Sequence, residues 1–252
     1  MSFQSDIGII GGSGFYRLNT GLTDQQLSYQ EIETPYAKQK VKLAQERLAN
    51  RPVYFLPRHG EQHNLPPHKI NYRSNLWALK EAGVTSIIAV NAVGGIKHGL
   101  SPGTIVIPDQ LIDYTWGREH SFFDGLNSLH DHCDFTFPYD SRLREILLEA
   151  AATLKMPVSN GGCFACTQGP RLETAAEIQK LKRDACDIVG MTGMPEAVLA
   201  RELGIAYVCI ALVVNPAAGL SDELISLDAI KKVLSTGLDD IRSLISASLL
   251  EI

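Results

Sequence analysis

The sequence lacks several features that would assign a protein to a large functional class. Its 252 residues contain no cluster of basic side chains, because the 23 lysines and arginines are scattered and the formal net charge is −5. Nucleic-acid-binding domains usually carry such a cluster. No uninterrupted apolar run approaches the roughly 20 residues that a membrane-spanning helix requires. The sequence therefore predicts a protein that binds neither nucleic acid nor membrane.

Cysteine is scarce, and the spacing of the metal-binding residue types is unfavourable. The five cysteines are an odd number, and the first ten residues, MSFQSDIGII, lack the basic and long apolar segments of a secretion signal. CFAC, at 163–166, has redox or half-zinc spacing but no second pair and a strand-like context, so we interpret these cysteines as apolar packing residues. The seven histidines lack the spacing of a tetrahedral metal site. We expect a cytoplasmic protein with no metal or organic cofactor.

Short apolar segments alternate with amphipathic segments along most of the chain. Those predicted as strands are 6–12, 51–60, 84–95, 103–112, 160–168, 186–193 and 205–215. Those predicted as helices are 73–83, 140–155, 173–185, 194–204 and the segment from Leu227 onward. This order predicts an α/β fold, with a parallel or mixed sheet between helices, in one domain over residues 1–252.

Polar residues stand near the ends of four predicted strands. The first strand runs into the glycine-rich turn GGSG around Ser13, and the second ends with Arg58 and His59. Asn91 and Thr192 follow two later apolar segments. Backbone amides of a glycine turn and an arginine fork both suit an anion, so we expect a shared anion pocket. The glycine turn alone is equally consistent with a simple tight turn.

Six ordered motifs resemble the purine nucleoside phosphorylase family, in its trimeric branch that includes the methylthioadenosine phosphorylases. These motifs are IIGGSG, PRHGEQHNLPPHKINYRSNLWALK, AVNAVGGI, PGTIVIPDQLIDYT, TQGPRLET and GMTGMPEAVLARE. The resemblance implies a mixed, twisted and partly barrel-like sheet flanked by helices, and a homotrimer. It also implies that inorganic phosphate, as co-substrate, attacks C1′ of a purine nucleoside and releases the free base.

The family's site residues can be carried over onto matching positions. The phosphate-binding positions fall on Ser13, Arg58, His59, Asn91, Ala92 and Thr192, although the family usually has threonine or serine in place of Asn91. The ribose-binding position is Met191, and the base-binding positions are Leu172, Glu173 and Asn215. His132 aligns with a histidine that borders the 5′ substituent from the neighbouring subunit, the alternative being a surface histidine.

Two of these positions predict a 6-oxopurine base. Asn215 replaces the aspartate of adenine-specific members, and its amide can donate to a 6-oxo group. Glu173 replaces their serine, and its carboxylate can accept the N1–H of hypoxanthine but would face the bare N1 of adenine. A second adenine-reading aspartate is replaced by Ala217. The simpler alternatives are that Glu173 begins a helix and that Asn215 turns the chain before a proline.

The combined pattern predicts phosphorolysis of S-methyl-5′-thioinosine to hypoxanthine and 5-methylthioribose 1-phosphate. Asn215, Glu173, Arg58 and His59 are the expected catalytic residues. The alternatives are a methylthioadenosine phosphorylase and a general inosine/guanosine phosphorylase. A purine-binding sensor without turnover and a hydrolytic nucleosidase are further possibilities, but the retained Arg58 and His59 argue for an enzyme that binds phosphate.

Overall fold

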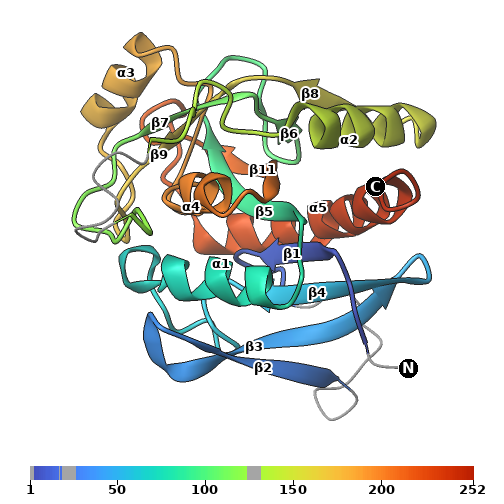
Figure 1. Ribbon diagram of the computed structural model, residues 1–252. Helices are drawn as coiled ribbons and strands as arrows, with labels where there is room; N and C mark the ends of the chain where they lie inside the picture. Colours follow the sequence, from blue (N-terminus) through green and yellow to red (C-terminus); the bar gives the residue numbers. More distant parts are fainter. Residues whose placement is uncertain (1–2, 17, 19–26, 124–131) are drawn as a thin grey trace.

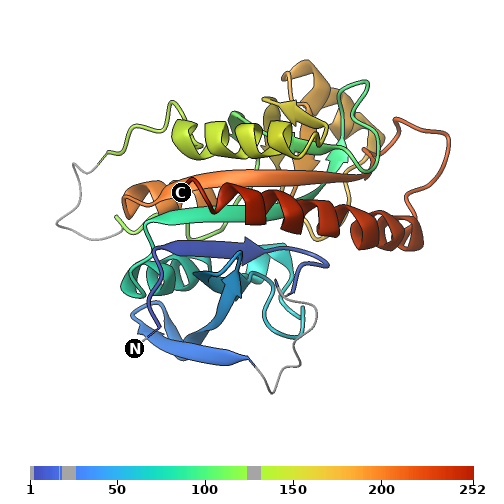
Figure 2. The ribbon, with the colours of Figure 1, turned by 90° about the vertical axis from the view of Figure 1, so that its right-hand side faces the viewer.

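The computed structural model describes residues 3–16, 18, 27–123 and 132–252. These residues form an α/β fold built on one mixed sheet (Figures 1 and 2). The strands are β1 (Ile7–Gly11), β2 (Ser28–Thr34), β3 (Ala37–Leu48), β4 (Arg51–Pro57), β5 (Ser86–Gly95), β6 (Ile105–Ile107), β7 (Gln110–Asp113), β8 (Val158–Asn160), β9 (Cys163–Cys166), β10 (Ile188–Gly190) and β11 (Ala206–Pro216). The helices are α1 (Tyr72–Glu81), α2 (Ser141–Thr153), α3 (Ala175–Arg183), α4 (Glu196–Glu202) and α5 (Leu227–Ser248), with a short 3₁₀ turn, η2 (Pro67–Lys69).

Strand β5 is the branch point of the sheet. One main path runs β2-β3-β4-β1-β5-β10-β9-β7, and β11 joins β5 to β6 and β8. β5 is parallel to β1 and β11 but antiparallel to β10. The sheet is therefore mixed, as the sequence predicted.

The helices cover both faces of the sheet. α1 and α4 pack against each other on one face, whereas α2 and α5 pack together on the other, as the two views of the ribbon show (Figures 1 and 2). Helices α1, α2, α3 and α5 each present an apolar stripe at helical spacing. The side chain of the residue just before each of them caps its N-terminus; these residues are Asn71, Asp140, Thr174 and Ser226. Because β5 and β11 lie between two helical layers, their side chains are buried on both sides and their sequences are almost continuously apolar.

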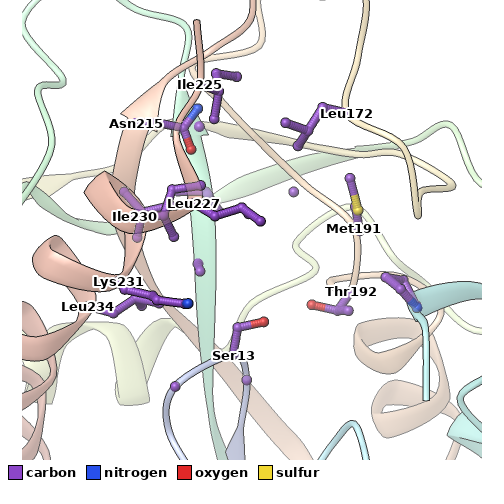
Figure 3. A pocket seen from close by; sticks show the side chains of 18 of the residues that line it. Ser13, Leu172, Met191, Thr192, Asn215, Ile225, Leu227, Ile230, Lys231 and Leu234 are labelled. Carbon is purple, nitrogen blue, oxygen red and sulfur yellow. The ribbon is translucent and has the colours of Figure 1, made fainter. Parts of the chain in front are cut away.

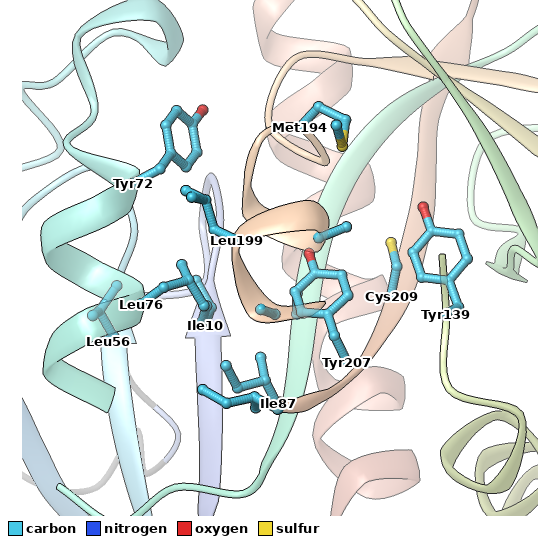
Figure 4. Close-up of a cluster of buried hydrophobic side chains, with 14 of the residues drawn as sticks. Ile10, Leu56, Tyr72, Leu76, Ile87, Tyr139, Met194, Leu199, Tyr207 and Cys209 are labelled. Carbon is cyan, nitrogen blue, oxygen red and sulfur yellow. The ribbon is translucent and has the colours of Figure 1, made fainter. Parts of the chain in front are cut away.

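One of the two main cores contains several tyrosines (Figure 4). Ile10 from β1, Leu76 from α1 and Leu199 from α4 form its apolar centre. Tyr207 and Tyr139 stack beside it with their ring centroids 6.2 Å apart. The Tyr207 hydroxyl donates a 2.8 Å hydrogen bond to a buried carboxylate of Glu196, so this core reaches a charged group as well as apolar side chains.

The structure differs from the sequence-based expectation in several strands, and β8 was not predicted as a strand separate from β9. The antiparallel hairpin of β2 and β3 was not predicted, because polar residues predominate in both strands and the apolar alternation is limited to a few positions such as Val41 and Leu43. Segment 103–112 was predicted as one strand but forms β6 and β7, separated by Pro108, which has no backbone N–H to continue a ladder.

The cysteines and helices of the described residues add two findings. All five cysteines are free thiols, and Cys166, in the CFAC segment of β9, is fully buried. In the part of the chain that the structure describes, every helix is too short or too polar to cross a membrane.

Candidate active site

A cavity lies beside the middle of β5, in the gap between the end of its pairing with β1 and the start of its pairing with β10. β1 accompanies β5 as far as Ala89, and β10 pairs with it at Gly94 and Gly95. Residues from both sides of this gap, from the end of β11 and from α5 line a cavity of about 720 Å³ (Figure 3). Because β10 runs antiparallel to β5, the turn after β10 returns toward the middle of β5 rather than toward its end.

The glycine turn after β1 brings the chain close to the floor of the cavity. A Cβ atom on Gly12 would lie 2.7 Å from the Val90 carbonyl oxygen and 2.9 Å from Nη1 of Arg58. The turn can therefore approach β5 this closely only with glycine at this position. It places Ser13 on the cavity wall with its hydroxyl directed into the space (Figure 3).

Arg58 lies on the cavity wall and is held by a buried ion pair. Its Nε and Nη2 donate to the two carboxylate oxygens of Glu196 at 2.7 and 2.8 Å, and its Nη1 donates to the Val90 carbonyl at 2.9 Å. Burial alone would lower the pKa of Arg58, but the Glu196 carboxylate outweighs burial and raises that pKa. A guanidinium group has five N–H donors, so one on each terminal nitrogen remains for a ligand.

His59 is a neutral side chain at neutral pH. Burial lowers its pKa to about 4, and the positive charge of Arg58 acts in the same direction. Its Nδ1 lies 2.8 Å from the Leu65 carbonyl, which can only accept, so Nδ1 carries the hydrogen and Nε2 is a lone-pair acceptor. His59 can therefore accept a proton or hydrogen bond from a ligand but does not add positive charge at pH 7.

His63, a cavity residue that the sequence analysis did not assign, lies beside Ser13 and His59. Its Nε2 lies 3.3 Å from the Ser13 hydroxyl oxygen, and its ring centroid is 4.6 Å from that of His59. Burial lowers the pKa of His63 as well. The sequence carried a signal for it, since His63 belongs to the quoted PRHGEQH motif, but no polar pattern distinguished it from a loop histidine.

Asn91 is not among the described residues that line the cavity, and its predicted contact with phosphate stays a prediction. It is buried within β5, and its Nδ2 donates a 2.9 Å hydrogen bond to the Thr192 hydroxyl oxygen. Thr192 lines the cavity, as does Ala92. Because Thr192 accepts from Asn91, its own hydroxyl hydrogen is directed to another acceptor, which gives Asn91 a positioning role.

The predicted base-binding residues gather at the opposite end of the cavity. Glu173 accepts a 2.6 Å hydrogen bond from the Thr167 hydroxyl, and Nδ2 of Asn215 donates to the Pro216 carbonyl at 2.6 Å. The second Nδ2 hydrogen and Oδ1 of Asn215 remain for a ligand. Asn215 stands at an irregularity in the pairing of β11 with β5, and Leu172 lies across the cavity from it (Figure 3). Met191 also lines the wall.

Helix α5 forms an apolar wall that the sequence analysis assigned only to packing. Its cavity-lining apolar residues, with one from the preceding loop, are Ile225, Leu227, Ile230, Leu234 and Leu238. They fall on one side of the helix at helical spacing. The spacing was visible in the sequence, but a stripe of this kind indicates burial without indicating that a cavity adjoins it.

Arg118 is a second residue that sequence reasoning missed. Its side chain is 8% exposed. It connects two segments, the turn that contains Met191 and the loop that follows β9. It donates to the backbone carbonyls of Thr167, Gln168, Met191 and Met194 at 2.6–3.2 Å. Such contacts fix the two loops relative to each other. The sequence around Arg118 did not indicate this role, because a single arginine in an irregular segment belongs to no recognisable motif.

His132 is exposed and lies outside the set of described residues that line the cavity. Residues 124–131 of the same irregular segment lie outside the described residues. The chain's own cavity therefore includes every predicted site residue except His132 and Asn91.

Comparison with known proteins identifies the family. The family model described as the phosphorylase superfamily matches residues 6–250. Together with the mixed sheet and the cavity beside β5, this shows that the chain belongs to the phosphorylase superfamily.

Individual relatives resemble the chain over nearly its whole length. A probable S-methyl-5′-thioinosine phosphorylase from Pseudomonas syringae pv. tomato is 50% identical over 93% of this chain and 94% of its own. A 6-oxopurine nucleoside phosphorylase from Pyrococcus furiosus is 42% identical over 96% of this chain and 91% of its own. The solved structure of the methylthioadenosine phosphorylase from Schistosoma mansoni in complex with adenine superposes with a TM-score of 0.89 at 32% identity, covering 98% of this chain and 91% of that one.

Proposed function

We propose that the protein is a purine nucleoside phosphorylase that converts S-methyl-5′-thioinosine and phosphate into hypoxanthine and 5-methylthioribose 1-phosphate. The names of relatives at 50% and 42% identity agree with a methylthio substituent and a 6-oxopurine base, respectively. In this reaction the C1′–N9 bond breaks as a bond forms between C1′ and a phosphate oxygen. The electron pair of the broken bond passes to the purine, which takes up a proton.

The hydrogen-bonding groups at the base end carry the proposed 6-oxopurine preference. Glu173 presents a carboxylate that can accept the N1–H of hypoxanthine, and Asn215 can both donate to the 6-oxo oxygen and accept from a protonated N7. Adenine would leave the carboxylate facing the N1 lone pair. A site that leaves a buried polar group unpaired discriminates strongly, by about 10⁴ to 10⁵ in favourable cases.

The other two parts of the cavity supply the remaining requirements of the reaction. Ser13, Thr192 and the two remaining N–H groups of Arg58 form a donor set for phosphate beneath C1′. The apolar wall of α5 suits a methylthio group better than a 5′-hydroxyl, which would lose hydrogen bonds to water there. A neutral His59 can accept the hydrogen of a protonated phosphate oxygen.

The deciding experiment measures base release from three nucleosides, methylthioinosine, methylthioadenosine and inosine, each with and without phosphate. We expect phosphate-dependent hypoxanthine release from methylthioinosine, at a kcat/KM well above those of the other two. Efficient adenine release would instead assign a methylthioadenosine phosphorylase, and rapid turnover of inosine a general 6-oxopurine enzyme. Release that continues without phosphate would assign a hydrolase.

We also propose a homotrimer in which His132 borders the 5′ substituent bound by a neighbouring subunit. Large apolar side chains on the surface support an assembly, among them Trp116 at 72%, Phe137 at 70% and Leu224 at 95% exposure. Light scattering on the purified protein should give three times the chain mass of 27.6 kDa. His132→Ala should then raise the KM for methylthioinosine and leave the KM for phosphate unchanged; equal effects on both would contradict this role.

The proposed reaction takes place in the cytoplasm, serves purine salvage and uses phosphate as its co-substrate without a metal or organic cofactor. In this proposal Ser13, Thr192 and Arg58 donate hydrogen bonds to the phosphate, so that no metal is needed to hold it. Dialysis against a chelator should leave the rate of base release unchanged. A loss of activity that added divalent metal restores would contradict this part of the proposal.

A further inference from the structure

The described residues that line the cavity provide little uncompensated positive charge for an anion. Arg58 is neutralised by its bidentate pair with Glu196, and both side chains are essentially fully buried. His59 and His63 both have pKa values lowered by burial and are neutral at pH 7. Glu173 adds a carboxylate to the same cavity. Without a further cation, this set of groups carries a net negative charge, although inorganic phosphate is itself an anion.

Lys231, on α5, is the remaining lysine or arginine among the described residues that line the cavity. Figure 3 shows its amine extending into the space toward which the hydroxyls of Ser13 and Thr192 point, whereas Asn215 and Leu172 lie at the other end. The amine is thus at the end of the cavity that the proposed function gives to phosphate. Together with Ser235 it is a polar residue among the largely apolar residues of α5 that line the cavity.

The ion pair that Lys231 makes in the structure is weak. Its Nζ lies 3.8 Å from Oδ1 of Asp228, and the two side chains are 77% and 94% exposed. Exposed pairs of this kind contribute little to stability. The lysine side chain is flexible and ends in a compact charge. The amine can therefore leave Asp228 at little cost in free energy when an anion is bound in the cavity, where it is less exposed to water.

We propose that Lys231 binds the phosphate co-substrate, its ammonium group supplying from α5 the positive charge that the buried Arg58–Glu196 pair does not. This role rests on the proposed function, because that function makes the anion phosphate. α5 would then contact both substrates. Its apolar residues would pack against the 5′ substituent of the nucleoside, and Lys231 would bind the phosphate.

The experiment compares Lys231→Met with a matched control, Lys232→Met. Lys232 is the next residue on the same helix and is exposed, but it does not line the cavity. Binding of inorganic phosphate is measured by calorimetry without nucleoside, and the KM values for phosphate and nucleoside are measured separately. Lys231→Arg keeps the charge and serves as the conservative variant. A thermal melt of each variant checks that it is folded.

For Lys231→Met we expect roughly tenfold weaker phosphate binding, the size of one charge-assisted hydrogen bond, with a nucleoside KM within about twofold of the wild type. Lys231→Arg should recover most of the loss, and Lys232→Met should bind like the wild type. Added potassium chloride should narrow the difference between Lys231→Met and the wild type. Indistinguishable phosphate binding by Lys231→Met and Lys232→Met would overturn the inference.

The two proposals can fail separately. If the wild type releases base in a phosphate-dependent reaction but Lys231→Met binds phosphate normally, only the role of Lys231 is wrong. If the wild type binds phosphate through Lys231 yet releases no base from any of the three nucleosides, only the proposed reaction is wrong. An equal rise of both KM values in Lys231→Met would assign Lys231 to the general shape of the cavity and overturn its role in phosphate binding.

Discussion

Several side chains of the candidate site have their hydrogen-bonding state fixed by a neighbour. Asn91 donates to Thr192, which leaves the threonine hydroxyl hydrogen for a ligand. The Pro216 carbonyl accepts from Asn215, which fixes the position of the amide nitrogen and turns Oδ1 to the other side. A substitution at one member of such a pair changes what the other can bind, so single-residue effects at this site should appear as changes in specificity.

The base preference can be tested by changing both base-end residues together. Asn215→Asp with Glu173→Ser should move the ratio of kcat/KM for methylthioinosine over methylthioadenosine toward adenine by at least about a hundredfold, because the carboxylate no longer faces N1. Glu177→Gln is a suitable control, because Glu177 caps α3 and pairs with Arg171 outside the cavity. An unchanged ratio in a folded double variant would mean that the base binds elsewhere.

The buried Arg58–Glu196 pair should matter greatly for stability. Glu196→Ala leaves the Arg58 guanidinium in an apolar interior without its partner, which typically costs about 3–5 kcal/mol of unfolding free energy. Urea unfolding of the wild type and of Glu196→Ala measures this difference in unfolding free energy. Glu119→Ala removes a partner of Arg73 whose own side chain is 75% exposed, and it should cost less than about 1 kcal/mol. Similar losses in the two variants would show that burial does not amplify the effect at Glu196.

At the scale of elements, the site depends on how closely the turn after β1 approaches β5. Gly12→Ala would force its new methyl group against the Val90 carbonyl and Arg58, and displacement of the turn should raise the KM for phosphate by about tenfold or more. Gly99→Ala is a matched control, since Gly99 has a φ of +91° but open space around its Cβ position. It should lower stability without changing the KM for phosphate; a similar KM change in both variants would point to a general loss of structure.

The apolar side of α5 should determine the preference for the 5′ substituent. Ile230→Asn places an amide in the wall of the cavity, so we expect kcat/KM for methylthioinosine to fall by about tenfold relative to that for inosine. Thr236→Asn introduces the same side chain on α5 at a position that is exposed and outside the cavity lining. A constant ratio of the two substrates in Ile230→Asn would place the 5′ substituent away from α5.

The stability of the whole molecule should depend on pH through His59. Its pKa is about 4 in the folded protein and close to 6.5 in the unfolded chain, so between these values the unfolded chain binds more protons. The contribution of His59 to the unfolding free energy is therefore fully present above about pH 6.5. It decreases as the pH falls toward 4, by up to about 3 kcal/mol.

Urea unfolding of the wild type and His59→Gln across pH 4–7 isolates this contribution, because the other titrating groups are common to both proteins. The difference in unfolding free energy between the two should shrink as the pH falls. A constant difference would mean that His59 can take up its proton in the folded protein.

The sequence by itself determined the elements whose local pattern is strong. The strands at the centre of the sheet, the amphipathic helices and the membership of the phosphorylase superfamily followed from apolar runs, helical spacing and ordered motifs. Ser13, Arg58, His59, Asn91 and Thr192 were predicted to share a pocket, and the structure brings all of them except Asn91 to one cavity. Their roles toward a ligand stay predictions.

Only the tertiary structure decided which groups neutralise, orient or enclose these residues. Glu196 stands 138 positions from its partner Arg58, Asn91 stands 101 positions from Thr192, and α5 reaches the cavity from the end of the chain. The β2–β3 hairpin was likewise not predicted, because polar residues predominate in its strands although Ile32, Val41 and Leu43 pack against the core. Local sequence patterns report the burial and period of a segment, whereas these contacts depend on which distant segments the folded sheet brings together.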